Sequence, residues 1–99
     1  MKTFEVATAS ADDFLKQVIE AIHGRELGNM TTLQKSGNEI TVTISKLGTT
    51  ELKYLLEPLS TGFKAALKSE KIAFAHRPFR ADIEGKLQRV MEKLGAKCT

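Results

Sequence analysis

The sequence contains one cysteine, Cys98, and a lone cysteine cannot close a disulfide within the chain. This scarcity agrees with a reducing compartment, where thiols stay unpaired. Residues 1–13 carry one lysine followed by polar and acidic side chains, and they lack the apolar run that a secretory signal needs. No apolar run approaches the roughly 20 residues that span a bilayer. We therefore expect a cytoplasmic protein without a membrane span.

Groups that carry common catalytic chemistry are also scarce. The two histidines, His23 and His76, stand far from each other and from the cysteine, so no zinc-ligand spacing occurs. Neither glycine-rich phosphate-binding motif is present. We therefore expect no metal, no cofactor and no catalytic residues, and we favour a noncatalytic protein over an enzyme. The enzyme alternative would depend on His76 acting with a carboxylate that folding brings near.

Basic charge is placed unevenly along the chain. Residues 1–63 hold six Lys or Arg and eight Asp or Glu, whereas residues 64–99 hold nine and four. The net charge of +3 therefore arises in the last third, and such asymmetry favours an acidic partner. Tryptophan is absent and only one tyrosine occurs, so a stacking surface for nucleic-acid bases has little support.

The chain opens with a strand pattern and then a helix pattern. Phe4 and Val6 have the period of a half-buried strand. Ser10 with Asp13 predicts the capped start of a helix, and Gly24 predicts its end. The inward residues of this helix are expected to be Phe14, Leu15, Val18, Ile19 and Ile22.

A loop and a hairpin are expected next. Residues 25–29 predict the loop, and residues 30–36 and 39–45 predict strands around a turn at 37–38. The second of these strands alternates without error between apolar and polar side chains, which indicates one buried and one solvated face. Its apolar residues are Ile40, Val42 and Ile44.

The segment from residue 49 to residue 68 fits both a helix and two strands. We favour strands because Pro58 would remove a backbone donor in mid-helix and Gly62 would weaken the remainder of such a helix. Residues 71–76 predict a final strand after a turn at 69–70. The inward residues of the middle strands are then Leu52, Tyr54, Leu56, Phe63, Ala65 and Leu67.

The last segment predicts a long amphipathic helix. It begins near Pro78, which suits the first turn of a helix, and it ends at Gly95. The element order predicts an α+β fold, a two-layer sandwich of the β-α-β(n)-α type with an antiparallel sheet packed against this C-terminal helix. We expect residues 1–99 to form a single small domain. The apolar stripe of the helix contains Phe79, Ile83, Leu87, Val90, Met91 and Leu94.

The helix-first, hairpins-next order and the ending PFRADIEGKLQRVMEKL resemble helix-grip proteins, such as small relatives of the Bet v 1 and START families. They are also similar to the small bacterial proteins of polyhydroxyalkanoic acid granule systems. The resemblance implies a curved antiparallel sheet that wraps the terminal helix. This chain is much shorter than a full ligand-binding Bet v 1 protein, and likeness of fold alone does not assign a function.

From this layout we expect a noncatalytic binding or accessory domain. It would hold an apolar small molecule or a protein partner between the sheet and the C-terminal helix, where such folds often leave a cleft. The alternative is that the aromatic side chains of this region simply fill the core, since so short a chain has few others to do so. The expected ligand-binding residues are Tyr54, Phe63, Phe74, His76 and Phe79.

Anion or nucleic-acid binding through the basic last third is the alternative function. Three of its candidate residues share one flank of the terminal helix, where Asp82 can pair with Lys86. That flank can equally be a solvated helix surface, and the segment 76–80 can be a plain corner between strand and helix. The candidate residues are Arg77, Arg80, Lys86, Arg89 and Lys93.

Self-association is a further alternative. A strand at residues 30–36 could form one edge of the sheet and pair across a twofold axis. A homodimer of this kind would bury Leu33 and an outward-facing Leu55.

Overall fold

The computed structural model describes residues 1–7 and 10–99 of the chain. Within this described part, six strands form one antiparallel sheet in the order β2-β3-β4-β5-β1-β6. The strands are β1 (Thr3–Val6), β2 (Thr31–Ser36), β3 (Glu39–Ser45), β4 (Thr49–Leu59), β5 (Gly62–Lys71) and β6 (Ala96–Cys98). The helices are α1 (Ala11–Ile22), α2 (Glu26–Met30), the 3-10 helix η1 (Phe74–Phe79) and α3 (Arg80–Lys93).

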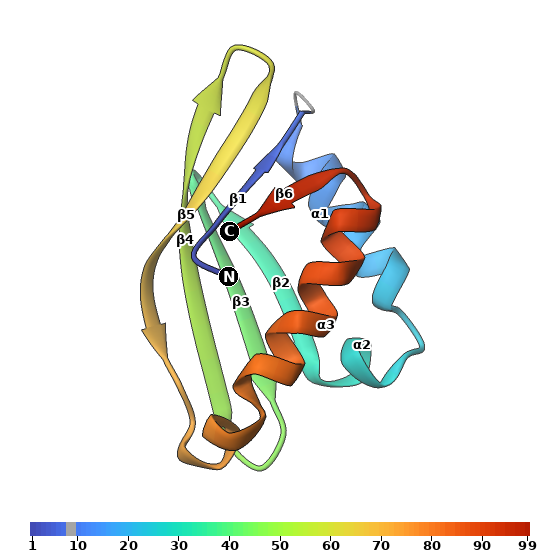
Figure 1. Ribbon diagram of the computed structural model, residues 1–99, viewed down its shortest axis with the longest axis vertical. Helices are drawn as coiled ribbons and strands as arrows, with labels where there is room; N and C mark the ends of the chain where they lie inside the picture. Colours follow the sequence, from blue (N-terminus) through green and yellow to red (C-terminus); the bar gives the residue numbers. More distant parts are fainter. Residues whose placement is uncertain (8–9) are drawn as a thin grey trace.

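The helices lie on one face of the curved sheet, so the molecule has two layers (Figure 1). The predicted α+β architecture, with an antiparallel sheet packed against a C-terminal helix, is confirmed. The hairpin between β4 and β5 extends at one end of the molecule (Figure 1). The turn between β3 and β4, the 3-10 helix η1 and the start of α3 meet at the other end.

Alternating side chains give the sheet its buried face. In β3, Ile40, Val42 and Ile44 are buried against the helices, whereas Thr41 and Thr43 lie half-buried on the opposite face. Full burial of an aliphatic side chain of this size contributes roughly 1.5–3 kcal/mol. The strand predicted at residues 39–45 is therefore both formed and held by its apolar row.

Residues 49–68 lie in two strands, as predicted. Leu52 and Tyr54 in β4 and Phe63 in β5 face the helices and are buried. Tyr54 packs edge to face against Phe4 of β1, with 5.4 Å between the ring centroids. These rings occupy the centre of the interface between the sheet and the helices.

The first helix forms with the cap that its sequence predicts. The Oγ atom of Ser10 accepts a hydrogen bond from the backbone N–H of Asp13, at 3.1 Å. The helix ends at Ile22, shortly before Gly24 turns the chain with a φ of +78°. Ile19 is exposed, so its expected inward orientation is wrong.

Residues 26–30 form the short helix α2, where the sequence predicts a loop up to residue 29 and the start of a strand at Met30. Leu27 of this helix is buried, which ties the segment to the core. A Cβ atom on Gly28 would lie 2.0 Å from the carbonyl oxygen of Ile22, so only glycine lets α2 approach the end of α1 this closely. The helix is therefore held by tertiary contact, which a sequence with low helix propensity does not reveal.

The strand expected at residues 71–76 is wrong. Strand β5 runs through the expected turn at 69–70 and ends at Lys71, after which the chain forms η1. Phe74 is exposed and His76 is buried, because a 3-10 turn repeats every three residues rather than every two. Hydrogen bonds from the His76 ring to Thr50 and Lys46 hold this turn in place.

The terminal helix begins at Arg80, two residues later than Pro78 suggested. Leu87 and Met91 are buried as expected, but Phe79 is exposed, so its place in the apolar stripe is wrong. After the helix, Gly95 has a φ of +103° and reverses the chain. The following residues pair with β1 as β6, a strand that the sequence pattern does not predict.

Candidate functional site

The interface between the sheet and α3 is filled by side chains. Tyr54 and Phe63, two of the expected ligand-binding residues, lie in the core. The void beside Thr50, Leu52 and Ile83 measures about 10 Å³, which is the space that one water molecule needs. An apolar ligand between the layers would have to displace core side chains, so the space for a ligand lies at the surface. A ligand-binding role for Tyr54 and Phe63 stays a prediction.

The β3–β4 turn and η1 lie at the end of the molecule opposite the β4–β5 hairpin (Figure 1). Three large apolar side chains of these two segments are exposed. Leu47 in the turn is 88% exposed, Phe74 is 84% exposed and Phe79 is 61% exposed. They are the most exposed large apolar side chains of the described residues. The guanidinium of Arg77 lies over the Phe74 ring, 5.7 Å from its centroid.

A pocket of about 350 Å³ opens beside Leu47 and Phe79, and we call it the tip pocket. Its walls come from α2, the β3–β4 turn, and the contiguous η1 and start of α3, so three parts of the chain that are distant in sequence build it. Most of the exposed lining is apolar, and charged side chains stand among it. The lining residues are Glu26, Met30, Lys46, Leu47, Ala75, His76, Phe79, Asp82, Ile83 and Lys86.

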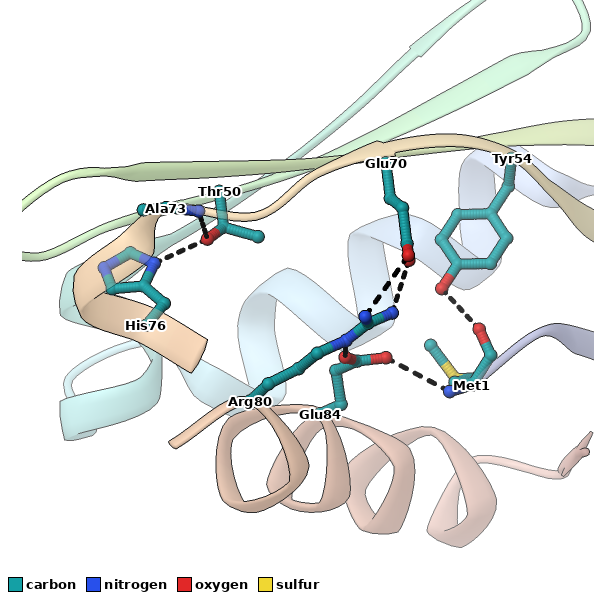
Figure 2. Close-up of polar contacts among 8 residues, drawn as sticks. All are labelled: Met1, Thr50, Tyr54, Glu70, Ala73, His76, Arg80 and Glu84. Atoms are coloured by element: carbon teal, nitrogen blue, oxygen red, sulfur yellow. Dashed lines mark hydrogen bonds and ion pairs between the residues drawn. The ribbon is translucent and has the colours of Figure 1, made fainter. Parts of the chain in front are cut away.

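His76 fixes one wall of the tip pocket through both of its ring nitrogens. Nδ1 lies 2.6 Å from the Oγ1 atom of Thr50, and that oxygen also accepts the backbone N–H of Ala73 at 3.0 Å (Figure 2). Nε2 contacts the carbonyl oxygen of Lys46, which can only accept, so Nε2 carries a proton and donates it. Both nitrogens of His76 are thus engaged within the fold, and the ring links η1 to β4 and to the β3–β4 turn.

Arg80, an expected anion-binding residue, is already paired with carboxylates. Its Nε atom donates to Glu84 at 2.5 Å, and its two terminal nitrogens donate to Glu70, one of them at 3.2 Å (Figure 2). The hydrogen bonds to Glu84 and then to Glu70 raise the pKa of Arg80 above its ordinary value. This guanidinium joins α3 to β5, and its charge is neutralised within the fold.

Glu84 and Tyr54 extend the same network toward the start of the chain. The ammonium group of Met1 lies 3.1 Å from the Oε1 atom of Glu84. The hydroxyl of Tyr54 donates to the carbonyl oxygen of Met1 at 2.8 Å (Figure 2). Burial, and next the negative charge of Glu84, raise the pKa of Tyr54. This cluster is structural, because its polar groups are satisfied by one another.

A second depression of about 310 Å³ lies between α2 and the middle of α3, and we call it the basic groove. Within residues 1–7 and 10–99, no ion pair joins Arg25, Arg89 or Lys93 to a carboxylate. The groove therefore carries uncompensated positive charge over an apolar floor. Its lining residues are Arg25, Glu26, Leu27, Lys86, Arg89, Val90 and Lys93.

The tip pocket and the basic groove adjoin, because Glu26 and Lys86 line both. Each of these two residues is paired with a group at the tip. The Nζ atom of Lys46 lies 3.5 Å from Glu26, and that of Lys86 lies 3.3 Å from Asp82, the pair that the sequence predicts. The border between the two depressions is thus close to neutral, and the free charge lies in the basic groove.

The structure brings together some of the expected residues and separates others. Lys86, Arg89 and Lys93 share the basic groove. His76 and Phe79 share the tip pocket, whereas Arg77 stands apart with Phe74. The sequence pattern did not indicate Arg25, Met30, Leu47 or Ile83 as site residues.

These missed residues carried little signal in the sequence. Arg25 precedes α2 and Met30 ends it, and this helix is too short to show a period; Leu47 lies in a turn. An apolar residue directly before a turn glycine, as in Lys46-Leu47-Gly48, was the one available clue. Ile83 belongs to the predicted apolar stripe of α3, where it is half-buried and still reaches the pocket.

A metal site and a reactive thiol have little support in the described residues. No group of three or more His, Cys, Asp and Glu side chains is arranged to hold a metal ion in the part of the chain that the structure describes. Burial, and next the charge of Glu92, raise the pKa of the Cys98 thiol, which makes it a poor nucleophile.

The edge strand β2 already has Leu33 buried within the monomer, so a homodimer would not need to cover that residue.

Comparison with protein-family models, with characterised proteins and with solved structures finds no match to this chain. The resemblance to helix-grip proteins therefore stays a prediction. In the described part of the chain, every helix is too short or too polar to cross a bilayer.

Proposed function

We propose that this chain is a noncatalytic binding module that accepts an apolar side chain of a protein partner in the tip pocket. One observation carries the proposal: Leu47 and Phe79, two of the three most exposed large apolar side chains described, line an apolar pocket, and the exposed Phe74 belongs to the same 3-10 helix as Phe79. Scattered apolar residues are ordinary on a protein surface, but a cluster beside a cavity is typical of an interaction site.

The backbone of Leu47 supports the same proposal. This residue has a φ of +57°, in the left-handed region that costs a residue with a branched side chain roughly 1–2 kcal/mol. The exposed side chain recovers almost none of that cost by packing within the fold. A strained, solvent-exposed leucine is unfavourable for the isolated molecule, and contact with a partner would offset the strain.

A protein partner fits the tip better than a small apolar molecule does. A ligand within the tip pocket would contact Phe79 and Ile83 but would leave the Phe74 ring, which is absent from the pocket lining, in water. A protein surface is broad enough to cover the pocket and Phe74 together. The tip also carries Lys46, Glu26 and Asp82 beside its apolar groups, which resembles the polar rim around an apolar interface centre.

The proposal is tested with a capped, neutral peptide that contains a central Leu-Phe pair, titrated into the whole chain by calorimetry. We expect a dissociation constant of about 1 mM or tighter, which is typical of one or two buried side chains. Leu47→Asn and Phe79→Ser should each weaken this binding. Leu59→Ser is the matched control, because Leu59 is a partly exposed leucine on the opposite hairpin.

Loss of binding in both tip variants, with binding kept in Leu59→Ser, would support the proposal. Binding that survives both tip substitutions would place the site elsewhere on the molecule. If indole or another small apolar molecule bound more tightly than the peptide in the same assay, a small-molecule ligand would replace the protein partner.

Anion or nucleic-acid binding is the second candidate function, and the basic groove favours it. Arg25, Arg89 and Lys93 supply unpaired positive charge, although Arg80 is not available. A labelled single-stranded oligonucleotide tests this candidate by titration at low and at physiological salt. A phosphate-driven complex should weaken steeply as salt rises, whereas unchanged affinity or no binding would reject it.

A further inference from the structure

The tip pocket and the basic groove adjoin, and they form two chemically different ends of one surface. Phe79 and Ile83 line the apolar end, and Arg89 and Lys93 line the basic end. All four residues come from α3 or from the residue just before it, so one helix sets the spacing of the two ends. A ligand that occupied both the tip pocket and the basic groove would need an apolar group and a negative group at a fixed separation.

The charges define what the basic end can accept. Lys46 and Lys86 are neutralised by Glu26 and Asp82. Arg25, Arg89 and Lys93 are exposed and have no carboxylate partner among the described residues. The basic end therefore complements a cluster of carboxylates rather than a neutral surface.

The spacing along α3 defines the length of the ligand. With a rise of 1.5 Å per residue, Ile83 lies about 9 Å from Arg89 and about 15 Å from Lys93 along the helix axis. An extended peptide rises about 3.3 Å per residue, so roughly three to five residues separate a side chain in the tip pocket from carboxylates over the groove. This separation is short enough for one continuous segment of a partner.

We infer that the partner of this module presents an acidic peptide segment, with an apolar anchor residue in the tip pocket and Glu or Asp side chains about three to five residues away over Arg25, Arg89 and Lys93. The inference rests on the proposed function, since it specifies the chemistry of the same partner. A peptide fits better than a bilayer surface because the basic groove is a depression between α2 and α3, which a narrow segment can enter.

The test uses two capped peptides that share a Leu-Phe anchor and a flexible spacer of about four residues. One peptide ends in a run of glutamates and the other in a run of glutamines, and each is made in both sequence directions. We expect the glutamate peptide to bind about tenfold more tightly at low salt, as a few exposed charge contacts would give. The difference should shrink at high salt, where these contacts are screened.

Substitutions then assign the two ends separately. Arg89→Gln with Lys93→Gln should remove the advantage of the glutamate peptide and leave the glutamine peptide unchanged. Leu47→Asn should weaken both peptides. The matched control is Lys64→Gln with Lys68→Gln, which removes the same charge from the outer face of β5 and should leave both affinities unchanged.

Equal affinity of the two peptides in both directions would overturn the inference and leave the proposed function standing. Binding of neither peptide would overturn both. Binding to vesicles that contain phosphatidylserine is measured as the third part of the experiment. Vesicle binding that depends on Arg89 and Lys93, without preference for the glutamate peptide, would assign the basic groove to lipid and overturn the peptide inference.

Discussion

The ring of His76 lies against the hydroxyl of Thr50, with 2.6 Å between Nδ1 and Oγ1, although 26 positions separate the two residues. This contact joins η1 to the start of β4. The same ring holds the β3–β4 turn through the carbonyl oxygen of Lys46. The positions of Leu47 and Phe79 at the tip pocket therefore depend on one buried hydrogen-bonded link.

Replacing the hydroxyl of this link should destabilise the protein. Thr50→Val keeps the shape of the side chain but leaves the N–H of Ala73 and Nδ1 of His76 without a partner. We expect the free energy of unfolding to fall by about 1–3 kcal/mol, the cost of unsatisfied buried polar groups. Urea denaturation measures it, with Thr50→Ser as a control that retains the hydroxyl. A Thr50→Val protein as stable as the unmodified chain would contradict the role assigned to His76.

Relieving the strain at Leu47 should have the opposite effect on stability. Asparagine tolerates the left-handed conformation, so Leu47→Asn should raise the free energy of unfolding by up to about 1 kcal/mol. The same variant should lose affinity for the peptide with the Leu-Phe anchor. Leu59→Asn, at a residue without a left-handed φ, is the control and should give no gain. Lower stability in Leu47→Asn would show that the exposed leucine packs within the fold.

Tyr54 should make the protein sensitive to alkaline pH. Burial raises its pKa in the folded state, so above about pH 10, the ordinary pKa of tyrosine, the unfolded chain loses a proton that the folded chain keeps. Stability is therefore unaffected by Tyr54 below that pH and falls above it, by about 1.4 kcal/mol per pH unit. Tyr54→Phe should remove this dependence.

Ultraviolet absorbance of tyrosinate can follow Tyr54 directly, because the chain contains a single tyrosine and no tryptophan. The ionisation of the folded protein should coincide with its alkaline unfolding. Titration at the ordinary pKa with the fold intact would show that the ring is accessible to water.

The network around Arg80 should contribute to stability through charge. Glu84→Gln keeps the volume of the side chain but removes the negative charge that Arg80 contacts at 2.5 Å. We expect a loss of about 1–2 kcal/mol in thermal or urea unfolding, because Arg80 is partly exposed and retains its bonds to Glu70. Glu92→Gln, on the exposed face of the same helix, should have little effect. Equal losses in the two variants would argue against a specific network.

The sequence predicted the elements whose signals are local. The alternation of Ile40, Val42 and Ile44 identified β3, and the cap formed by Ser10 and Asp13 identified the start of α1. The assignment at 71–76 was wrong because its conformation depends on contacts with Thr50 and Lys46, which are distant in sequence. Alternation over a few residues cannot report such contacts.

The basic groove and the tip pocket also differed in how far the sequence could predict them. Lys86, Arg89 and Lys93 lie on one helix, so helical spacing predicted that they would share a surface. The tip pocket joins Met30 and Leu47 to Phe79 across three separate segments. No periodicity connects residues on different elements, so the tip pocket could be found only from the structure.

Methyl NMR of the unmodified chain, titrated with the anchored glutamate peptide, shows directly where the peptide binds. We expect the resonances of Met30, Leu47 and Ile83 to shift with added peptide, while those of Leu59 and Leu55, at the other end and on the outer face of the sheet, stay unchanged. Shifts confined to Leu55 or Leu59, or no shift at the tip at saturating peptide, would contradict the assignment of the tip pocket as the binding site.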